Sequence, residues 1–299
     1  MKAKHKDFTK HLVHHFRVID GEKFRLKDYA PDDLAGHDVD ESEANRLLAD
    51  GVARLTALQD KLAAQNEWAL LISLQGMDAG GKDGTIKHVM SGVNPQGVQV
   101  TAFKQPSSEE LSHDFLWRTH RAMPERGRIG IHNRSHYEEV LVCRVHPELL
   151  EKQRLPKELR EGGKFWKHRL EDIAHVERYM ARQGTVQLKF FLHLSKDEQK
   201  RRFLSRIDTP AKNWKFSSAD LVERGFWNDY QAAYEEAIQA TAKPHSPWFI
   251  VPADHKWFAH LVVVEAIVDA LDKLNLKVPS PPAEECARLQ EARAKLEAE

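Results

Sequence analysis

The chain has 299 residues, of which 41% are hydrophobic and 30% are charged, the balance of a soluble globular protein rather than a disordered one. Its 45 basic and 45 acidic side chains cancel, which argues against a nucleic-acid-binding protein. Two cysteines without metal-ligand or disulfide spacing favour a reducing, cytoplasmic location. No stretch has the ~20 apolar residues of a membrane span, so we expect no membrane partner.

Residues 1–45 combine charged residues with five irregularly spaced histidines. We predict an N-terminal extension that wraps the body, with its histidines on the surface or in packing contacts. A histidine-based metal site is the alternative. After this extension, the sequence predicts one domain over residues 46–278.

A helix is predicted over residues 41–65, where leucines recur at helical spacing. The nearly continuous apolar run from Trp68 to Leu74 then predicts a strand buried on both faces. Further strands are expected at 98–103, 129–132, 186–194 and 248–251, and a helix at 166–182. Because strands and helices alternate, the sequence predicts an α/β sandwich with a mostly parallel sheet.

A basic segment follows the strand at 186–194. Ser195 to Glu198 predicts a capping box that opens a helix, and residues 196–215 hold seven Lys or Arg against three Asp or Glu. Residues 217–240 return to a helical pattern. We predict that residues 196–228 form a helical hairpin or lid over the carboxyl edge of the sheet, and that residues 279–299 form a charged helical tail.

The segment from Gly76 to Lys82 has the G-x4-G-K spacing of a phosphate-binding loop, between a predicted strand and a predicted helix. A glycine-rich path lets backbone N–H groups converge on phosphate, the helix adds the positive end of its dipole, and Lys82 adds a mobile charge. Asp83 replaces the usual Ser or Thr after the lysine, so the hydroxyl that normally holds Mg²⁺ is missing. Asp78 within the loop is a candidate replacement ligand.

Polar residues also follow the strand at 129–132, and ligands gather at the carboxyl ends of strands in open α/β sheets. Asn133 stands where aspartate usually ends such a strand, and Glu138 offers a carboxylate five residues later. Arg134 is placed to bridge phosphates, for which a guanidinium is well suited. A surface ion pair between Arg134 and Glu138 is the alternative.

Several motifs together resemble the polyphosphate kinase 2 family. They are Gly76-Met-Asp-Ala-Gly-Gly-Lys-Asp-Gly84, Asn133-Arg-Ser-His-Tyr137, Lys189-Phe-Phe-Leu-His-Leu-Ser195, Lys212-Asn-Trp-Lys-Phe-Ser217 and Trp248-Phe-Ile-Val-Pro-Ala-Asp-His-Lys-Trp257. The resemblance implies a three-layer α/β/α P-loop kinase sandwich, thymidylate-kinase-like, with a helical lid. It also implies phosphoryl transfer between inorganic polyphosphate and a nucleotide, with Mg²⁺ or, in its place, Mn²⁺. The placement of Asn133 and Glu138 resembles the class III branch, which accepts both AMP and ADP.

The resemblance also implies roles for individual residues. Lys82, Arg134 and Asp78 would be catalytic, and Asp78 and Glu138 would serve the metal. Phosphate- and nucleotide-binding groups would be Gly80, Gly81, Asp83, Gly84, Thr85, Asn133, Lys104 and Arg178, the last one helical turn from Arg182. Arg206, Lys212 and Lys215 in the lid would line a channel for polyphosphate.

With this resemblance, the sequence predicts a polyphosphate-dependent kinase of adenine nucleotides. The resemblance also implies guanine nucleotides as further acceptors and a homodimer or homotetramer as the assembly. Two other functions stay open. An ATP-dependent nucleoside monophosphate kinase would use the same fold without polyphosphate. A non-catalytic polyphosphate or nucleotide sensor would bind without turnover, and Asp83 and Asn133 are the departures from pattern that favour it.

Overall fold

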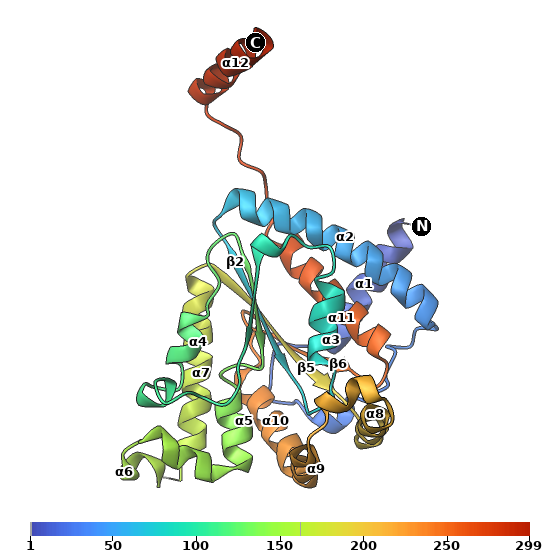
Figure 1. The fold of residues 1–299 in the computed structure, drawn as a ribbon, viewed down its shortest axis with the longest axis vertical. Helices are drawn as coiled ribbons and strands as arrows, with labels where there is room; N and C mark the ends of the chain where they lie inside the picture. The colour runs from blue at the N-terminus through green and yellow to red at the C-terminus, as the bar shows by residue number, and fades with distance from the viewer. Residues whose placement is uncertain (1, 162) are drawn as a thin grey trace.

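The computed structural model describes residues 2–161 and 163–299, and it centres on a mostly parallel sheet (Figure 1). The strands follow the order β1-β6-β5-β2-β4-β3 across the sheet. Their bounds are Arg17–Val18 for β1, Ala69–Gln75 for β2, Val98–Ala102 for β3, Ile129–Asn133 for β4, Thr185–His193 for β5 and Trp248–Pro252 for β6. β2 to β6 pair in parallel, and β1 alone runs antiparallel, against β6.

Helices cover both faces of this sheet. They are α1 (Lys2–Phe16), α2 (Glu41–Gln65), α3 (Lys82–Val89), α4 (Trp117–Arg121), α5 (Glu138–Val145), α6 (Lys157–Arg160), α7 (Phe165–Arg182), α8 (Lys196–Asp208), α9 (Ser218–Gly225), α10 (Trp227–Thr241), α11 (Lys256–Asp272) and α12 (Ala283–Glu297). Short 3₁₀ turns are η1 (Leu26–Asp28), η2 (Pro95–Gly97), η3 (Glu110–Ser112), η4 (Pro147–Gln153) and η5 (Pro210–Lys215). None of the helices that the structure describes is long and apolar enough to cross a membrane.

The three-layer α/β architecture predicted from the sequence is confirmed. All seven residues of β2 are buried, because helices pack on both faces of this central strand. One core lies between the sheet and the layer formed by α1, α2, α3 and α11. A second core lies on the opposite face, against α5, α7 and α10.

The N-terminal segment is more closely integrated than the predicted extension. After α1, which packs against α11, the chain adds β1 to the sheet by pairing Arg17 with Phe249 and Val18 with Trp248. Leu12 and Phe16 on α1 are buried in the main core. The C-terminal segment contains a helix, in the range where the sequence predicts a charged helical tail. All residues of α12 are exposed, and the helix projects away from the body (Figure 1).

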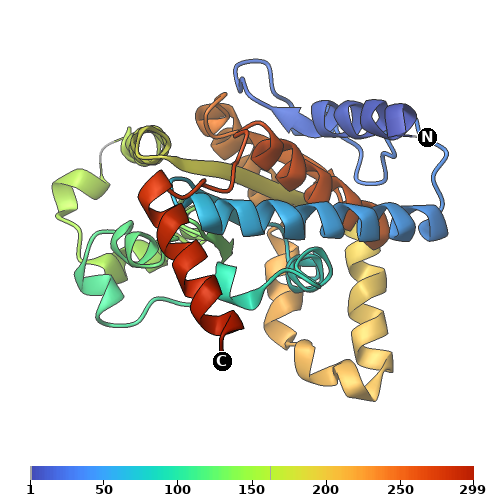
Figure 2. The same ribbon diagram turned by 90° about the horizontal axis from the view of Figure 1, so that it is seen from above.

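The basic segment after β5 forms a helical hairpin that extends from the body (Figure 2). It comprises α8, η5 and α9, and a break at Phe226 separates α9 from α10, where the sequence pattern predicted one helix. Ser195 caps α8 by accepting from the Glu198 N–H, as predicted. The reciprocal half of the expected capping box is wrong, because Asp254 accepts the Ser195 N–H and Glu198 binds arginines of its own helix.

Acid should destabilise this fold through buried histidines. Burial lowers the pKa of His132, in the central part of the sheet, from 6.5 to about 4. Between these two values the unfolded chain binds a proton that the folded chain does not, so stability is lost as pH falls from 6.5 towards 4. The contribution of His132 is on the order of 3 kcal/mol. In thermal melts, His132→Gln should flatten the pH dependence of Tm, whereas His14→Gln, at an exposed position, should follow wild type. A parallel slope for His132→Gln would contradict this account.

Candidate active site

The glycine-rich segment 76–81 connects β2 to α3 and leaves the first turn of α3 open to a ligand. Gly81 lies at a φ of 103°, a region that favours glycine. A Cβ on Gly80 would lie 2.8 Å from the Met77 carbonyl oxygen, so the loop requires glycine there too. The first N–H groups of a helix have no partner within the helix, and here they belong to Lys82, Asp83 and Gly84. The loop therefore has the backbone geometry of an anion site.

Lys82 folds back over this loop. Its ammonium donates to the Gly76 carbonyl at 2.6 Å and to the Met77 carbonyl at 3.3 Å, which leaves a third N–H for an anion. Burial, together with the positive charge of Arg134, lowers the pKa of Lys82 to about 8. A bound phosphate would relieve both effects, because it supplies the negative charge that the amine faces.

Arg134 brings the two predicted carboxylates together. Its guanidinium donates to Asp78 Oδ1 and to Glu138 Oε2, each at 3.1 Å. The backbone of Arg134 has a φ of 64°, and its N–H donates to the Leu74 carbonyl of β2. The Arg134–Glu138 pair that the sequence left open as a surface feature therefore exists, but it belongs to a larger group that includes the phosphate loop.

The two departures from the usual P-loop pattern contact each other. The Asn133 side-chain amide donates to Asp83 Oδ1 at 2.6 Å. The Asp83 carboxylate is thus held by the end of β4, beside the first turn of α3. At this position Asp83 offers an anion its backbone N–H rather than its side chain.

Two predicted phosphate-binding residues are placed differently from the prediction. The Thr85 hydroxyl and its N–H both donate to the Gly81 carbonyl, and the side chain is buried, so neither donor faces the loop. Arg178 lies on the exposed face of α7, as does Arg182, while the buried face of the same helix directs Glu177 onto Lys189. Neither arginine lines a cavity of the site, because the helical period turns both outward.

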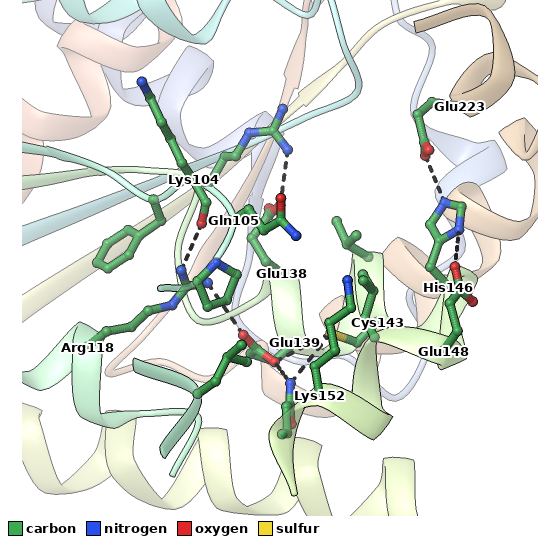
Figure 3. A pocket seen from close by; sticks show the side chains of 17 residues that line it. Lys104, Gln105, Arg118, Glu138, Glu139, Cys143, His146, Glu148, Lys152 and Glu223 are labelled. Carbon is green, nitrogen blue, oxygen red and sulfur yellow. Dashed lines mark hydrogen bonds and ion pairs between the residues drawn. The ribbon is translucent and has the colours of Figure 1, made fainter. Parts of the chain in front are cut away.

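A cavity of about 590 Å³ opens beside Arg134. Figure 3 shows the side chain of Glu138 at this cavity. Lys104, directly after β3, lines it, as do apolar groups from Phe103, Pro106, Leu111, Val142 and Leu149. Below it, Glu139 is buried and is reached by Arg118 at 3.4 Å, Arg169 at 3.5 Å and the Gln153 amide at 2.5 Å. Apart from Lys104, Arg134 and Glu138, sequence reasoning did not find this wall, because its residues come from β3, α4, α5 and η4 without a shared motif.

A second, smaller cavity lies over the phosphate loop and is lined by Gly76, Asp78 and Tyr234, among others. Arg134, Glu138, Val142 and Glu223 border both cavities. The two spaces therefore meet at the Arg134–Glu138 pair. A molecule in the larger cavity can present one end to the phosphate loop across that pair.

The helical hairpin places cations near the loop. Arg202 of α8 donates to the Ala79 carbonyl at 2.9 Å, and the Gln199 amide donates to the Asp78 carbonyl at 3.0 Å. Burial, together with the positive charges of Arg202, Lys212 and Arg206, lowers the pKa of Lys256, and Glu198 opposes this effect.

Further out on the hairpin, Arg206 pairs with Asp220 at 3.7 Å. The Lys215 ammonium lies 4.9 Å from the centre of the exposed Trp214 ring. Sequence analysis missed Arg202 and Gln199, since nothing in a run of charged residues shows which members face the loop.

The carboxylates of the site suit a divalent cation that is coordinated mainly by the phosphates of the substrate. No group of three His, Cys, Asp or Glu side chains arranged for a metal ion occurs in the described part of the chain. Asp78 and Glu138 nevertheless lie on either side of one guanidinium. Mg²⁺ is held in kinases by one or two carboxylates together with phosphate oxygens and water, so two carboxylates are sufficient.

A parallel sheet whose central strand runs into a glycine-rich loop and a helix, with lysine at the loop's end, defines a P-loop kinase fold. The family model of polyphosphate kinase 2 matches residues 38–279, and the chain belongs to this family.

Two relatives and one solved structure show how close the similarity is. The ADP-polyphosphate phosphotransferase of Rhodopseudomonas palustris is 50% identical over 88% of this chain and 91% of its own. The AMP/ADP-polyphosphate phosphotransferase of Meiothermus ruber is 42% identical over 89% of this chain and 95% of its own. The crystal structure of polyphosphate kinase 2 from Arthrobacter aurescens TC1 has a TM-score of 0.84 and 39% identity, and covers 94% of this chain and 96% of that chain.

Lys82→Ala should abolish most phosphoryl transfer. The ammonium is the mobile cation of the loop, and removing one such stabilising group typically costs about 100-fold or more in kcat. The matched control is Lys87→Ala, an exposed lysine of the same helix, which should retain near-wild-type kcat. Initial rates at saturating substrate measure the effect. A Lys82→Ala enzyme with a near-normal rate would remove this residue from the mechanism.

Proposed function

We propose that the protein transfers a phosphoryl group from inorganic polyphosphate to AMP or ADP, and that it catalyses the reverse reaction. The observation that carries the proposal is the meeting of two cavities at Arg134 and Glu138. The phosphate loop provides one anion site, and the 590 Å³ cavity beside it is in the size range of small-ligand pockets. Membership of the polyphosphate kinase 2 family supports polyphosphate as the donor.

In this proposal the larger cavity holds the nucleoside of the acceptor. Apolar side chains on one wall suit a base and ribose, and Lys104 and Arg134 supply positive charge toward the phosphates. Backbone donors at Gly81, Asp83 and Gly84 complete the phosphate site, with Asn133 holding Asp83 in place. The N–H of Gly80, also predicted to bind phosphate, instead donates to the Met77 carbonyl at 3.0 Å and closes the turn of the loop.

The donor would approach from the hairpin side. Residues 196–228 act as a lid, and Arg206, Lys212 and Lys215 form a basic path for a long polyanion. The excess of basic residues supports this role, because residues 196–215 hold seven Lys or Arg against three Asp or Glu. The proposed division of the chain is a kinase domain at 46–278, to whose sheet and core the extension 1–45 adds β1 and α1, and a tail at 279–299.

Catalysis would rest on positioning and charge neutralisation. The attacking oxygen belongs to a phosphate that is already anionic at neutral pH, so the step requires no strong general base. Lys82 and Arg134 face the place where negative charge accumulates during transfer. Mg²⁺, for which Mn²⁺ can substitute, would neutralise phosphate charge when held by Asp78 and Glu138.

Both AMP and ADP are proposed as acceptors. The relative from Meiothermus ruber is named for both nucleotides and that from Rhodopseudomonas palustris for ADP. The arrangement of Asn133 and Glu138, which resembles class III, supports the dual specificity. The family resemblance also supports guanine nucleotides as further acceptors, a homodimer or homotetramer, and a cytoplasmic location.

The proposal is tested by ³¹P NMR of the purified protein with Mg²⁺, long-chain polyphosphate and AMP, without ATP. We expect ADP resonances to grow first and ATP resonances to follow. ADP alone would restrict the acceptor to monophosphates. Transfer that starts only when ATP is added would establish the nucleoside monophosphate kinase instead, and binding without transfer from either donor would establish a sensor.

Filling the larger cavity should weaken binding of the acceptor nucleotide and leave binding of polyphosphate unchanged. Leu149 is half-buried in the cavity wall, and Leu149→Trp places a larger side chain there. We expect KM for AMP and ADP to rise about tenfold, the effect of losing roughly 1.4 kcal/mol of binding, with KM for polyphosphate unchanged. Leu159→Trp, on exposed α6, is the matched control. An equal rise in KM for polyphosphate would place the nucleotide elsewhere.

A further inference from the structure

Gln75 is the last residue of β2 and stands directly before the phosphate loop, with its side chain fully buried. Its amide has one orientation in which every polar atom faces a complementary partner. The oxygen accepts from the Ser135 hydroxyl and the Ser135 N–H, both at 3.0 Å, and the nitrogen donates to Glu138 Oε1 at 2.9 Å. Ser135 is itself buried at the end of β4 and accepts from the Tyr137 N–H, which orients its hydroxyl toward Gln75.

Glu138 is consequently held through both of its oxygens. Oε2 accepts from Arg134 at 3.1 Å, and Oε1 accepts from Gln75 at 2.9 Å. The first contact is between charged groups and can be exchanged when a phosphate competes for the guanidinium. The second comes from an uncharged amide on a buried strand, for which an anion does not compete, so it persists when Arg134 turns toward an anion.

The residue type at position 75 matters for this geometry. A carboxylate there would face the Glu138 carboxylate at hydrogen-bond distance, where like charges repel strongly. An apolar side chain would remove the donor of Glu138 Oε1, so the carboxylate would be held through Oε2 alone. An amide alone satisfies Ser135 and Glu138 at the same time while adding no charge.

We propose that Gln75 is the positioning residue of Glu138, fixing the direction in which this carboxylate faces the metal and the acceptor phosphate. The inference rests on the proposed function of the site. Because Gln75 is buried and lines neither cavity of the site, it acts through Glu138 and not directly.

The test begins with Gln75→Leu, assayed as polyphosphate-dependent formation of ADP and ATP. Loss of an outer contact to a metal-binding group typically costs 10- to 100-fold in affinity or activity. We expect kcat to fall at least tenfold and KM for polyphosphate to stay within twofold of wild type. Binding of Mn²⁺ to the enzyme–ADP complex, followed by electron paramagnetic resonance, should weaken at least tenfold.

Gln187→Leu is the matched control, since Gln187 is a buried glutamine of β5 that lines neither cavity of the site and whose amide donates to the Glu177 carbonyl at 2.6 Å. It reports the cost of deleting a buried, hydrogen-bonded amide, and it should lower Tm without altering kcat or Mn²⁺ binding. If Gln75→Leu behaves like Gln187→Leu, Gln75 is only structural and the inference is overturned.

The decisive measurement is the pair Gln75→Leu and Glu138→Gln, made singly and together. If Gln75 acts through Glu138, the double variant should match Glu138→Gln within twofold in Mn²⁺ binding and in kcat. Independent losses that multiply in the double variant would overturn the inference. A wild-type enzyme that transfers nothing from polyphosphate would instead defeat the proposed function, so the two failures are distinguishable.

Discussion

The site depends on the ion pairs that Arg134 forms with Asp78 and Glu138. Asp78 belongs to the loop after β2, and Glu138 begins α5 after β4, so one guanidinium ties together the carboxyl ends of two neighbouring strands. These ion pairs also offset the repulsion between the cations of the site. A surface that binds polyanions must gather cations, and their mutual repulsion disfavours the folded state. Here Arg134 lowers the pKa of Lys82, while Asp78 and Glu138 oppose that effect.

The phosphate loop and most of the sheet could be predicted because their signals are local. Spacing from Gly76 to Lys82 defines the loop, and the apolar run before it defines β2. The role of Asn133 could not be predicted from a local signal. Taken separately, Asn133 and Asp83 are two departures from the usual P-loop pattern, and they favour a non-catalytic sensor. Their contact at 2.6 Å joins residues fifty positions apart, so the two changes form one feature rather than two losses.

The remaining site residues escaped prediction because their placement depends on which face of an element they occupy and on partners far away in sequence. Thr85 follows the loop closely, yet its donors are satisfied by Gly81. Arg178 has suitable chemistry, yet it lies on the outer face of α7. Gln75 is the opposite case, because its position gives it a role that its residue type does not suggest. It is a neutral residue in a strand, and only the positions of Ser135 and Glu138 give it a role.

The hairpin that we propose as a lid is tied to the phosphate loop at its base. There, Arg202 donates to the Ala79 carbonyl of the loop and to the carbonyls of Ala253 and Asp254 after β6. At the tip, Trp214 is 79% exposed, and the Asn213 amide donates to the Arg206 and Ile207 carbonyls of α8, so these contacts stay within the hairpin. Local openings concentrate where buried apolar contacts are few. In the proposed closure, Arg202 would keep the base in register with the phosphate loop, so the backbone of the loop need not follow the tip.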